Sequence, residues 1–348
     1  MGASRNRRTR KRRGLGAVVF FALLSLLALT AATGFGGWMI LAPFGPSTET
    51  FVELVPGSTS ARVAQQLESA GVVRSQYAFD LLRWIRKGKL KAGEYRFDHP
   101  ATLIEVYDRI ARGDVFTIAV TVPEGASVFE IASRLEQAGI GTRQQFLDAQ
   151  PGLTDLVADL DPAAKSLEGY LFPDTYRFQR KATPLQVATA MVKRFRVVAA
   201  ELGLRQNVHE VVTLASLVER ETAIASERPL IASVFENRLA RHMPLMTDPS
   251  VIYGLEVHNL WRGEIYASDL KRDTPYNTYL HPGLPPGPIA NPGMLSLRAA
   301  MSPAHTSYLY FVAAGANPQG KSLFSSTIEE HNQNVAGYRH ALKKAGGR

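Results

Sequence analysis

Residues 213–254 read TLASLVERETAIASERPLIASVFENRLARHMPLMTDPSVIYG, and the rest of the chain is organised around this stretch. Apolar residues recur at helical spacing, which predicts one helix over residues 208–223 and a second helix after a tight connection. Two glutamates, Glu219 and Glu221, stand at the end of the first helix. We interpret the stretch as a catalytic carboxyl at a helix end, facing a polar loop at residues 246–250.

Glu221 has the local surroundings of a general acid. It follows Leu217 and Val218 by one turn and lies near the helix C-terminus, where the macrodipole is negative. Both features disfavour the ionised carboxyl and raise its pKa, as a general acid requires near neutral pH. Helical geometry does not choose between Glu219 and Glu221, which lie about 200° apart, and a solvated charged face is the alternative. A glycosidase with two carboxyls would pair Glu221 with an acid such as Asp248.

The positive charge of the chain is concentrated at its N-terminus. The 348 residues carry a net charge of +9, of which residues 1–14 contribute seven basic side chains and no acid. The basic balance therefore belongs to one tail and predicts no nucleic-acid partner. The chain has no cysteine, which excludes disulfides and thiolate chemistry. Its eight histidines lack metal-binding spacing, so we expect no metal and no cofactor.

Residues 15–42 predict a transmembrane helix. The run contains no charged side chain and exceeds the roughly 20 residues that cross a bilayer. The basic tail of residues 1–14 predicts a cytoplasmic N-terminus, which places the remainder outside the cytoplasm. A cleavable signal peptide is the alternative, because small residues occur within the run. Signal sequences have apolar regions of only about 7–15 residues, which favours a single uncleaved span in the plasma (inner) membrane.

Residues 50–120 predict a small α/β module, and part of its sequence is repeated in the next domain. The sequence VPGSTSARVAQQLESAG at residues 55–71 is repeated as VPEGASVFEIASRLEQAG at residues 122–139. A repeated strand–turn–helix unit is typical of duplicated small modules, such as LysM-like glycan-binding modules. Two unrelated strand–helix elements with similar apolar patterning are the alternative.

Residues 121–348 predict a larger α+β domain that carries the catalytic site. The aromatic motif SLEGYLFPDTY at residues 166–176 suits the apolar faces and hydroxyl rims of sugars, with a packed aromatic turn as the alternative. Residues 272–293 hold six prolines, which excludes regular structure and favours a rigid wall over a solvated linker. A strand over residues 308–312 and a helix over residues 327–344 close the chain.

The chain resembles the membrane-anchored endolytic murein (peptidoglycan) transglycosylases of the MltG/YceG family. The resemblance rests on LASLVERETAIASERPLIASVFENRL, TDPSVIYG, TPYNTY, GLPPGPIANPG and YLYFVA, with EGYLFPDTY upstream. It implies a LysM-like module at residues 50–120 and an enzyme without a metal or cofactor. Such an enzyme cuts glycan strands between N-acetylmuramic acid and N-acetylglucosamine and leaves a 1,6-anhydro-muramyl end. The resemblance also implies a role in ending strand growth, with cell-wall synthases as candidate partners.

The resemblance assigns the proton transfers to Glu221, the second acid of the E-R-E-T motif, and leaves Glu219 as a helper or structural acid. Met246 departs from the family pattern, in which a glutamine often precedes Thr-Asp-Pro. A non-catalytic peptidoglycan-binding scaffold and a hydrolytic glycosidase remain alternative functions. The other positions that the resemblance places along the glycan cleft are Thr247, Asp248, Ser250, Tyr276, Asn277, Glu168 and Tyr170.

Overall fold

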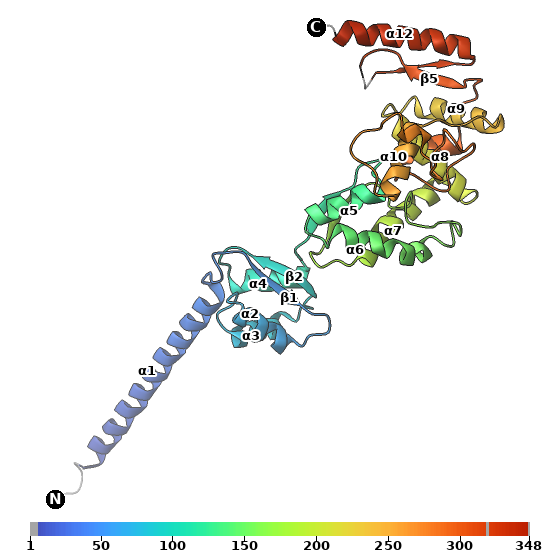
Figure 1. The fold of residues 1–348 in the computed structure, drawn as a ribbon. Helices are drawn as coiled ribbons and strands as arrows, with labels where there is room; N and C mark the ends of the chain where they lie inside the picture. The colour runs from blue at the N-terminus through green and yellow to red at the C-terminus, as the bar shows by residue number, and fades with distance from the viewer. Residues whose placement is uncertain (1–5, 318–319, 347–348) are drawn as a thin grey trace, which may run out of the picture. The chain divides into compact units, whose positions relative to one another are not determined.

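The computed structural model describes the backbone of residues 6–317 and 320–346, and side chains from residue 17 onward. It divides into two compact units, one ending at Phe116 and the other beginning at Thr117 (Figure 1). Part of the predicted cytoplasmic tail, residues 1–5, lies outside the described residues, as do residues 347–348 of the predicted catalytic domain.

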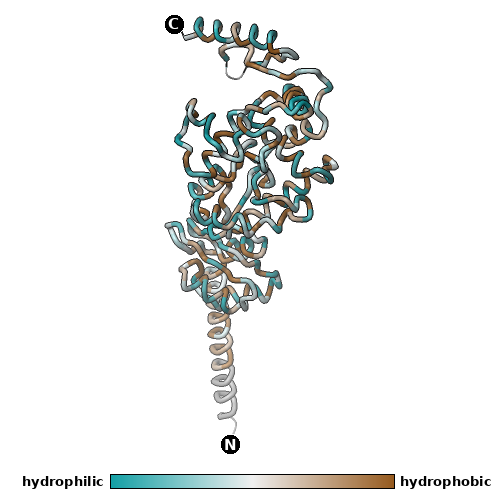
Figure 2. Tube along the Cα trace, turned by 45° about the vertical axis from the view of Figure 1, so that its right-hand side comes forward, coloured by the Kyte–Doolittle hydropathy of each residue, from teal (hydrophilic) through white to brown (hydrophobic). Residues whose placement is uncertain are grey.

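Helix α1 (Asn6–Leu41) contains the predicted span. Its apolar part, Ala17–Leu41, has 25 residues, a mean hydropathy of 2.2 and no buried side chains. At 1.5 Å per residue, this part is about 37 Å long, which exceeds the roughly 30 Å hydrocarbon core of a bilayer. Figure 2 shows it coloured from white to brown along most of its length. The helix is long and apolar enough to be a membrane anchor. A signal sequence would satisfy the same criteria of length and composition.

The N-terminal unit folds around one two-stranded sheet. Strands β1 (Thr50–Leu54) and β2 (Gly93–Phe97) pair antiparallel, with helices α2 (Ser60–Ser69) and α3 (Gln76–Arg86) between them in the chain. Helix α4 (Leu103–Arg112) follows β2. Both strands contribute buried side chains to a common core, which consists mainly of Leu54, Leu67, Phe79, Tyr95, Phe97 and Ile110.

The structure confirms that the two repeated sequences, at residues 55–71 and 122–139, form helices that begin and end in the same way. Helices α2 and α5 (Val128–Gln137) both begin at a hydroxyl N-cap, supplied by Thr59 and Ser127. Both end at a glycine with positive φ, which is 68° at Gly71 and 75° at Gly139. Glycine adopts this left-handed conformation without steric cost, so the two units stop their helices by the same device. The paired positions that fill the cores are Val63, Ala64 and Leu67 in the first copy and Ile131, Ala132 and Leu135 in the second.

The C-terminal unit is mostly helical and carries two further antiparallel strand pairs, β3–β4 and β5–β6. The chain is therefore of mixed α+β class, as predicted. The first unit ends before the predicted boundary at residue 120 because β3 pairs with β4 of the second unit. Besides α5, the elements are β3 (Ile118–Thr121), α6 (Arg143–Ala149), the 3-10 helix η1 (Gln150–Leu156), β4 (Thr175–Phe178), α7 (Pro184–Leu202), α8 (Val208–Glu221), α9 (Arg228–Ala240), α10 (Asp248–Val257), the 3-10 helix η2 (Asp269–Lys271), α11 (Met294–Met301), β5 (Tyr310–Ala313), β6 (Ser322–Ser325) and α12 (Ile328–Gly346).

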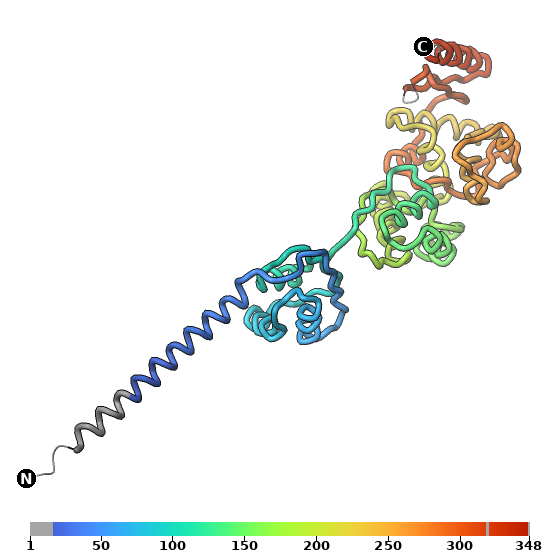
Figure 3. The backbone as a smooth tube through the Cα atoms, turned by 60° about the vertical axis from the view of Figure 1, so that its left-hand side comes forward, coloured from blue at the N-terminus to red at the C-terminus, as the bar shows by residue number. Residues whose placement is uncertain are grey.

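Helix α8 lies at the centre of the C-terminal unit. Its residues 212–218 are all buried, and α9, α10 and α11 pack against it (Figures 1 and 3). The helix ends at Glu221, two residues before the predicted end, because Thr222 is extended (φ −146°, ψ 138°). The Thr222 hydroxyl accepts a hydrogen bond from the Ile224 amide at 3.0 Å, which stabilises the turn toward α9. Glu221 is thereby the last helical residue.

Residues 272–293 have no helix or strand and are nevertheless anchored to the unit. The Asn277 side-chain amide donates to the carbonyls of Leu270 (3.1 Å) and Arg272 (2.8 Å). The Ile289 amide donates to the Ser216 hydroxyl on α8 at 3.0 Å. These bonds hold the segment in one shape, as predicted for a wall and not for a solvated linker.

Candidate active site at the end of helix α8

Glu221 is partly exposed at the C-terminal end of α8. Burial raises the pKa of its carboxyl to about 7, against the hydrogen-bonding influence of Thr247, and the negative charge of Asp248 raises it further. The positive charge of Arg238 on α9 lowers the same pKa. The sequence-based prediction of a raised pKa is therefore confirmed. Within the described part of the chain, Glu221 forms no ion pair closer than 4.0 Å.

The wall opposite Glu221 is the start of α10 and not the polar loop that the sequence predicted. Helix α10 begins at Asp248, with Pro249 in its first turn, where proline is favourable because the missing amide would have no helical partner. The preceding Met246 has a φ of +50°, and its amide donates to the Thr278 carbonyl at 3.1 Å. The Thr247 amide donates to the Thr278 hydroxyl at 3.0 Å. The proline-rich segment thus fixes the entry into α10.

Thr247 and Asp248 contribute a hydroxyl and a carboxylate, respectively, to the surroundings of Glu221. The Thr247 hydroxyl oxygen is buried, and no partner with full hydrogen-bond geometry lies among the described residues, although it is close enough to influence Glu221. Asp248 is exposed, and its Oδ1 accepts a hydrogen bond from the Tyr279 hydroxyl at 2.6 Å. The site therefore combines one acid of raised pKa with an oriented carboxylate and a buried hydroxyl.

Arg238 and Tyr279 complete the site, and neither was among the predicted site residues. Arg238 donates to the carbonyls of Leu309 and Leu245, each at 2.7 Å, and burial lowers its pKa. Its guanidinium is near enough to Glu221 and Tyr279 to interact with both electrostatically. In the sequence, Arg238 is one basic residue on an amphipathic helix, so only the packing of α9 against α8 reveals its role.

Glu219 lies two residues before Glu221, but its carboxylate is held by an ion pair and by a backbone amide. Arg228 donates to Glu219 Oε1 at 2.8 Å, and the Gly293 amide donates to Oε2 at 2.9 Å. The side chains are only 4% (Glu219) and 6% (Arg228) exposed. Burial raises the pKa of Glu219, while the Gly293 amide and Arg228 favour its ionised form. The pair ties α8 to the start of α9 and to the segment before α11.

Glu168 and Tyr170 lie in the interior, which does not fit the predicted contact with a glycan strand. Glu168 is 1% exposed and accepts from the Val128 amide (2.8 Å) and the Asn291 side chain (2.7 Å). Burial raises its pKa to about 8. Tyr170 is fully buried, and its hydroxyl donates to Asp161. Both side chains join the aromatic motif to other parts of the C-terminal unit.

Two further predicted cleft residues are also buried. Ser250 is fully buried, and its hydroxyl donates to the Thr247 carbonyl at 2.8 Å. Asn277 is fully buried, and its side chain bonds to the backbone of Leu270, Arg272 and Tyr279. Tyr276 is half-buried, with its ring 4.8 Å from that of Tyr253 in an edge-to-face arrangement. Of the predicted residues, the structure thus brings Glu221, Thr247 and Asp248 together, and Ser250 holds the backbone at Thr247.

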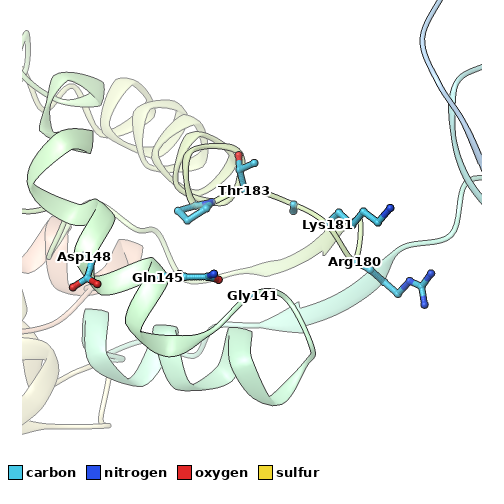
Figure 4. Close-up of a pocket in the computed structure, with 8 residues that line it drawn as sticks. Gly141, Gln145, Asp148, Arg180, Lys181 and Thr183 are labelled. Atoms are coloured by element: carbon cyan, nitrogen blue, oxygen red, sulfur yellow. The ribbon is translucent and has the colours of Figure 1, made fainter.

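The C-terminal unit also has a cavity elsewhere on its surface. A shallow cavity of about 620 Å³ lies between the turns that precede α6 and α7, away from Glu221. Figure 4 shows Gln145 directed across it and Arg180 and Lys181 extending from the far end. Among the described residues, no group of three or more histidine, aspartate or glutamate side chains is arranged to hold a metal ion.

The fold and the site define a mixed α+β protein with an apolar N-terminal helix and an active-site candidate centred on one carboxyl. The chain belongs to the YceG-like family, whose model matches residues 52–337. It is 33% identical over 320 residues to the endolytic murein transglycosylase of Bacillus subtilis (strain 168), with 85% of this chain and 87% of the relative covered.

A second relative and a solved structure agree with this assignment. The endolytic murein transglycosylase of Streptococcus pneumoniae (strain R6) is 29% identical over 355 aligned positions, which cover 90% of this chain and 64% of the relative. The crystal structure of a yceG-like protein from Listeria monocytogenes matches with a TM-score of 0.56 and 32% identity. That match covers 83% of this chain and 99% of the Listeria chain.

Proposed function

We propose that this protein is a lytic transglycosylase that cuts peptidoglycan glycan strands within the chain. The bond cut is the one between N-acetylmuramic acid and N-acetylglucosamine, and the product is a 1,6-anhydro-muramyl end. The names of the Bacillus and Streptococcus relatives support the substrate and the reaction class. The chemistry of the site supports a mechanism that needs one acid–base group.

The observation that carries the proposal is the environment of Glu221. A carboxyl with a pKa of about 7 is protonated in a large fraction of molecules at neutral pH. It can therefore give a proton to a glycosidic oxygen and remains basic enough to take one back. Glu219 lacks this freedom because it is paired with Arg228 at 2.8 Å.

The reaction has two proton transfers and no net consumption of water. Glu221 donates its proton to the glycosidic oxygen, and the C1–O bond breaks with its electron pair on the departing N-acetylglucosamine. The Glu221 carboxylate then accepts the proton of the muramyl 6-hydroxyl as O6 forms a bond to C1. The ring closure restores the protonated acid, so one carboxyl completes the cycle.

The neighbours of Glu221 have distinct roles in this mechanism. The Asp248 carboxylate, oriented by the Tyr279 hydroxyl at 2.6 Å, raises the pKa of Glu221 and can stabilise positive charge that develops at C1. Arg238 stabilises the carboxylate form that must exist between the two proton transfers. The Thr247 hydroxyl is placed to hydrogen-bond the same carboxylate as it forms.

We also propose where the reaction takes place in the cell. The apolar part of α1, Ala17–Leu41, acts as an uncleaved anchor with the basic tail in the cytoplasm. The N-terminal unit is a LysM-like module, in keeping with its order of strand, helix, helix and strand and its antiparallel sheet. Cleavage at the outer face of the membrane would end the growth of nascent strands.

Product analysis of the Glu221→Gln variant tests the catalytic proposal. Purified peptidoglycan is incubated with the wild type, with Glu221→Gln and with Glu236→Gln, a control that neutralises an exposed glutamate on α9. We expect anhydro-muramyl fragments from the wild type and the control, and none from Glu221→Gln. Products heavier by one water would identify a hydrolase, and binding to sacculi without any new end would identify a scaffold. Undiminished cleavage by Glu221→Gln would overturn the assignment of the acid.

A further inference from the structure

Helix α3 of the N-terminal unit has a second apolar face that the unit does not bury. Phe79 and Leu82 point into the core, where they are 0% and 6% exposed. On the other side of the helix, Tyr77 is 76% exposed and Trp84 73% exposed. Leu81 and Ile85 on the same side are 54% and 59% exposed, and these four residues form one stripe at helical spacing. We refer to Tyr77, Leu81, Trp84 and Ile85 as the α3 stripe.

The α3 stripe begins beside the end of the apolar helix α1. The Arg74 guanidinium, two residues before α3, lies 4.2 Å from the centre of the Trp38 ring of α1 and donates to the Pro43 carbonyl at 3.0 Å. Ile40 of α1 packs against the core of the N-terminal unit. In Figure 1, α3 lies at the lower edge of this unit. The start of α3 is therefore held close to the end of α1.

The composition of the α3 stripe matches the boundary between lipid headgroups and acyl chains. Tryptophan and tyrosine favour this boundary because their rings are apolar and carry one polar group. Basic side chains around the stripe would face phosphate groups, as in helices that lie in the plane of a membrane. The exposed or half-exposed basic residues that follow Leu82 are Arg83, Arg86, Lys87, Lys89 and Lys91.

We infer that the α3 stripe inserts into the outer surface of the same bilayer that α1 crosses, so that anionic phospholipid covers it. The inference rests on the proposed anchoring of α1. Because α1 tethers the unit to the membrane, the α3 stripe is present at a high effective concentration near the lipid surface. Even a weak contact between the stripe and the lipid is therefore populated. Span and stripe together give the unit two points of attachment, which fix its orientation on the membrane.

Spin labels on the full-length protein in phospholipid vesicles test the inference. The chain has no cysteine, so Leu81→Cys, Trp84→Cys, Leu29→Cys in α1 and the exposed control Asp114→Cys each provide a single labelling site. The vesicles contain phosphatidylglycerol and no glycan. We expect the labels at positions 81 and 84 to collide with dissolved oxygen and to be protected from a water-soluble nickel chelate. Their ratio of oxygen to nickel accessibility should exceed that of position 114 severalfold.

The Leu29→Cys label separates failure of this inference from failure of the anchor. If position 29 is in lipid while positions 81 and 84 are as open to nickel as position 114, the α3 stripe is not on the membrane. If position 29 itself is open to nickel, the proposed anchor fails and the inference fails with it. The labels at positions 81 and 84 could instead be protected from both oxygen and nickel. If that protection disappears when each vesicle holds one chain, the α3 stripe is covered by a second copy of the protein and not by lipid. Unfolding midpoints equal to that of the wild type establish that each labelled variant is folded.

Discussion

Arg228 and Glu219 form a nearly buried ion pair, with 2.8 Å between Nη2 and Oε1. This contact gives different environments to two acids that lie two residues apart on α8. Burial raises the pKa of both carboxyls, but Glu219 is held in an ion pair with Arg228, whereas no such pair is formed by Glu221 at the end of the helix among the described residues. A structural acid and the proposed catalytic acid therefore lie within a single turn of α8.

The activity should decrease as the pH rises through about 7. The first step needs the protonated form of Glu221, whose pKa is raised to about 7. Since the Asp248 carboxylate raises this pKa, Asp248→Asn should move the alkaline limb of kcat/KM to lower pH. The measurement is the initial rate of anhydro-muramyl release between pH 5 and pH 9. A limb that stays in place in Asp248→Asn would contradict the electrostatic coupling of the two acids.

The stability of the fold should also report on Glu221. The pKa of this carboxyl is about 7 in the folded state and about 4.3 in an unfolded chain. Its contribution to stability is full below the unfolded pKa and decreases as the pH rises through the folded pKa. In Glu221→Gln this loss is absent, so the variant should gain about 1–3 kcal/mol relative to the wild type between pH 4 and pH 8. Urea unfolding at several pH values measures the difference, and the exposed Glu236→Gln variant should show no such trend.

Removing Arg228 should destabilise the protein strongly. Arg228→Met leaves Glu219 buried without its partner, which costs about 3–5 kcal/mol. The double variant Arg228→Met/Glu219→Met removes both charges and should recover part of this loss. Chemical unfolding of the wild type, both single variants and the double variant gives the coupling energy directly. Additive losses would show that the ion pair has little structural importance.

Two tyrosine variants distinguish support from participation in the site. Tyr170→Phe removes the buried hydrogen bond to Asp161 and should lower the free energy of unfolding by about 1–3 kcal/mol, with little change in kcat of the folded enzyme. Tyr279→Phe removes the hydrogen bond to Asp248 and should lower kcat with little loss of stability. Parallel measurement of unfolding and of turnover tests both expectations. A reversed pattern would assign the direct role to Tyr170.

Much of the framework was predictable because it depends on local patterns. Apolar spacing predicted α8 to within two residues at its end, and the repeated Val-Pro units predicted matching strand–turn–helix elements. Helix caps and turns involve neighbouring residues, so their signals are present in short segments. The main local error was the segment at residues 246–250, which was predicted as a loop although its last three residues form the first turn of α10.

By itself, the sequence determined the apolar helix, the α+β class and the choice of two candidate acids. Helical spacing alone left Glu219 and Glu221 undivided, and the physical difference between them comes from the tertiary structure, because Arg228 at the start of α9 and the Gly293 amide both reach Glu219. The same holds for Arg238, which joins the site through the packing of α9, and for Glu168, which the fold buries. Burial and charge compensation are properties of long-range packing, and they decide which carboxyl can keep its proton near neutral pH.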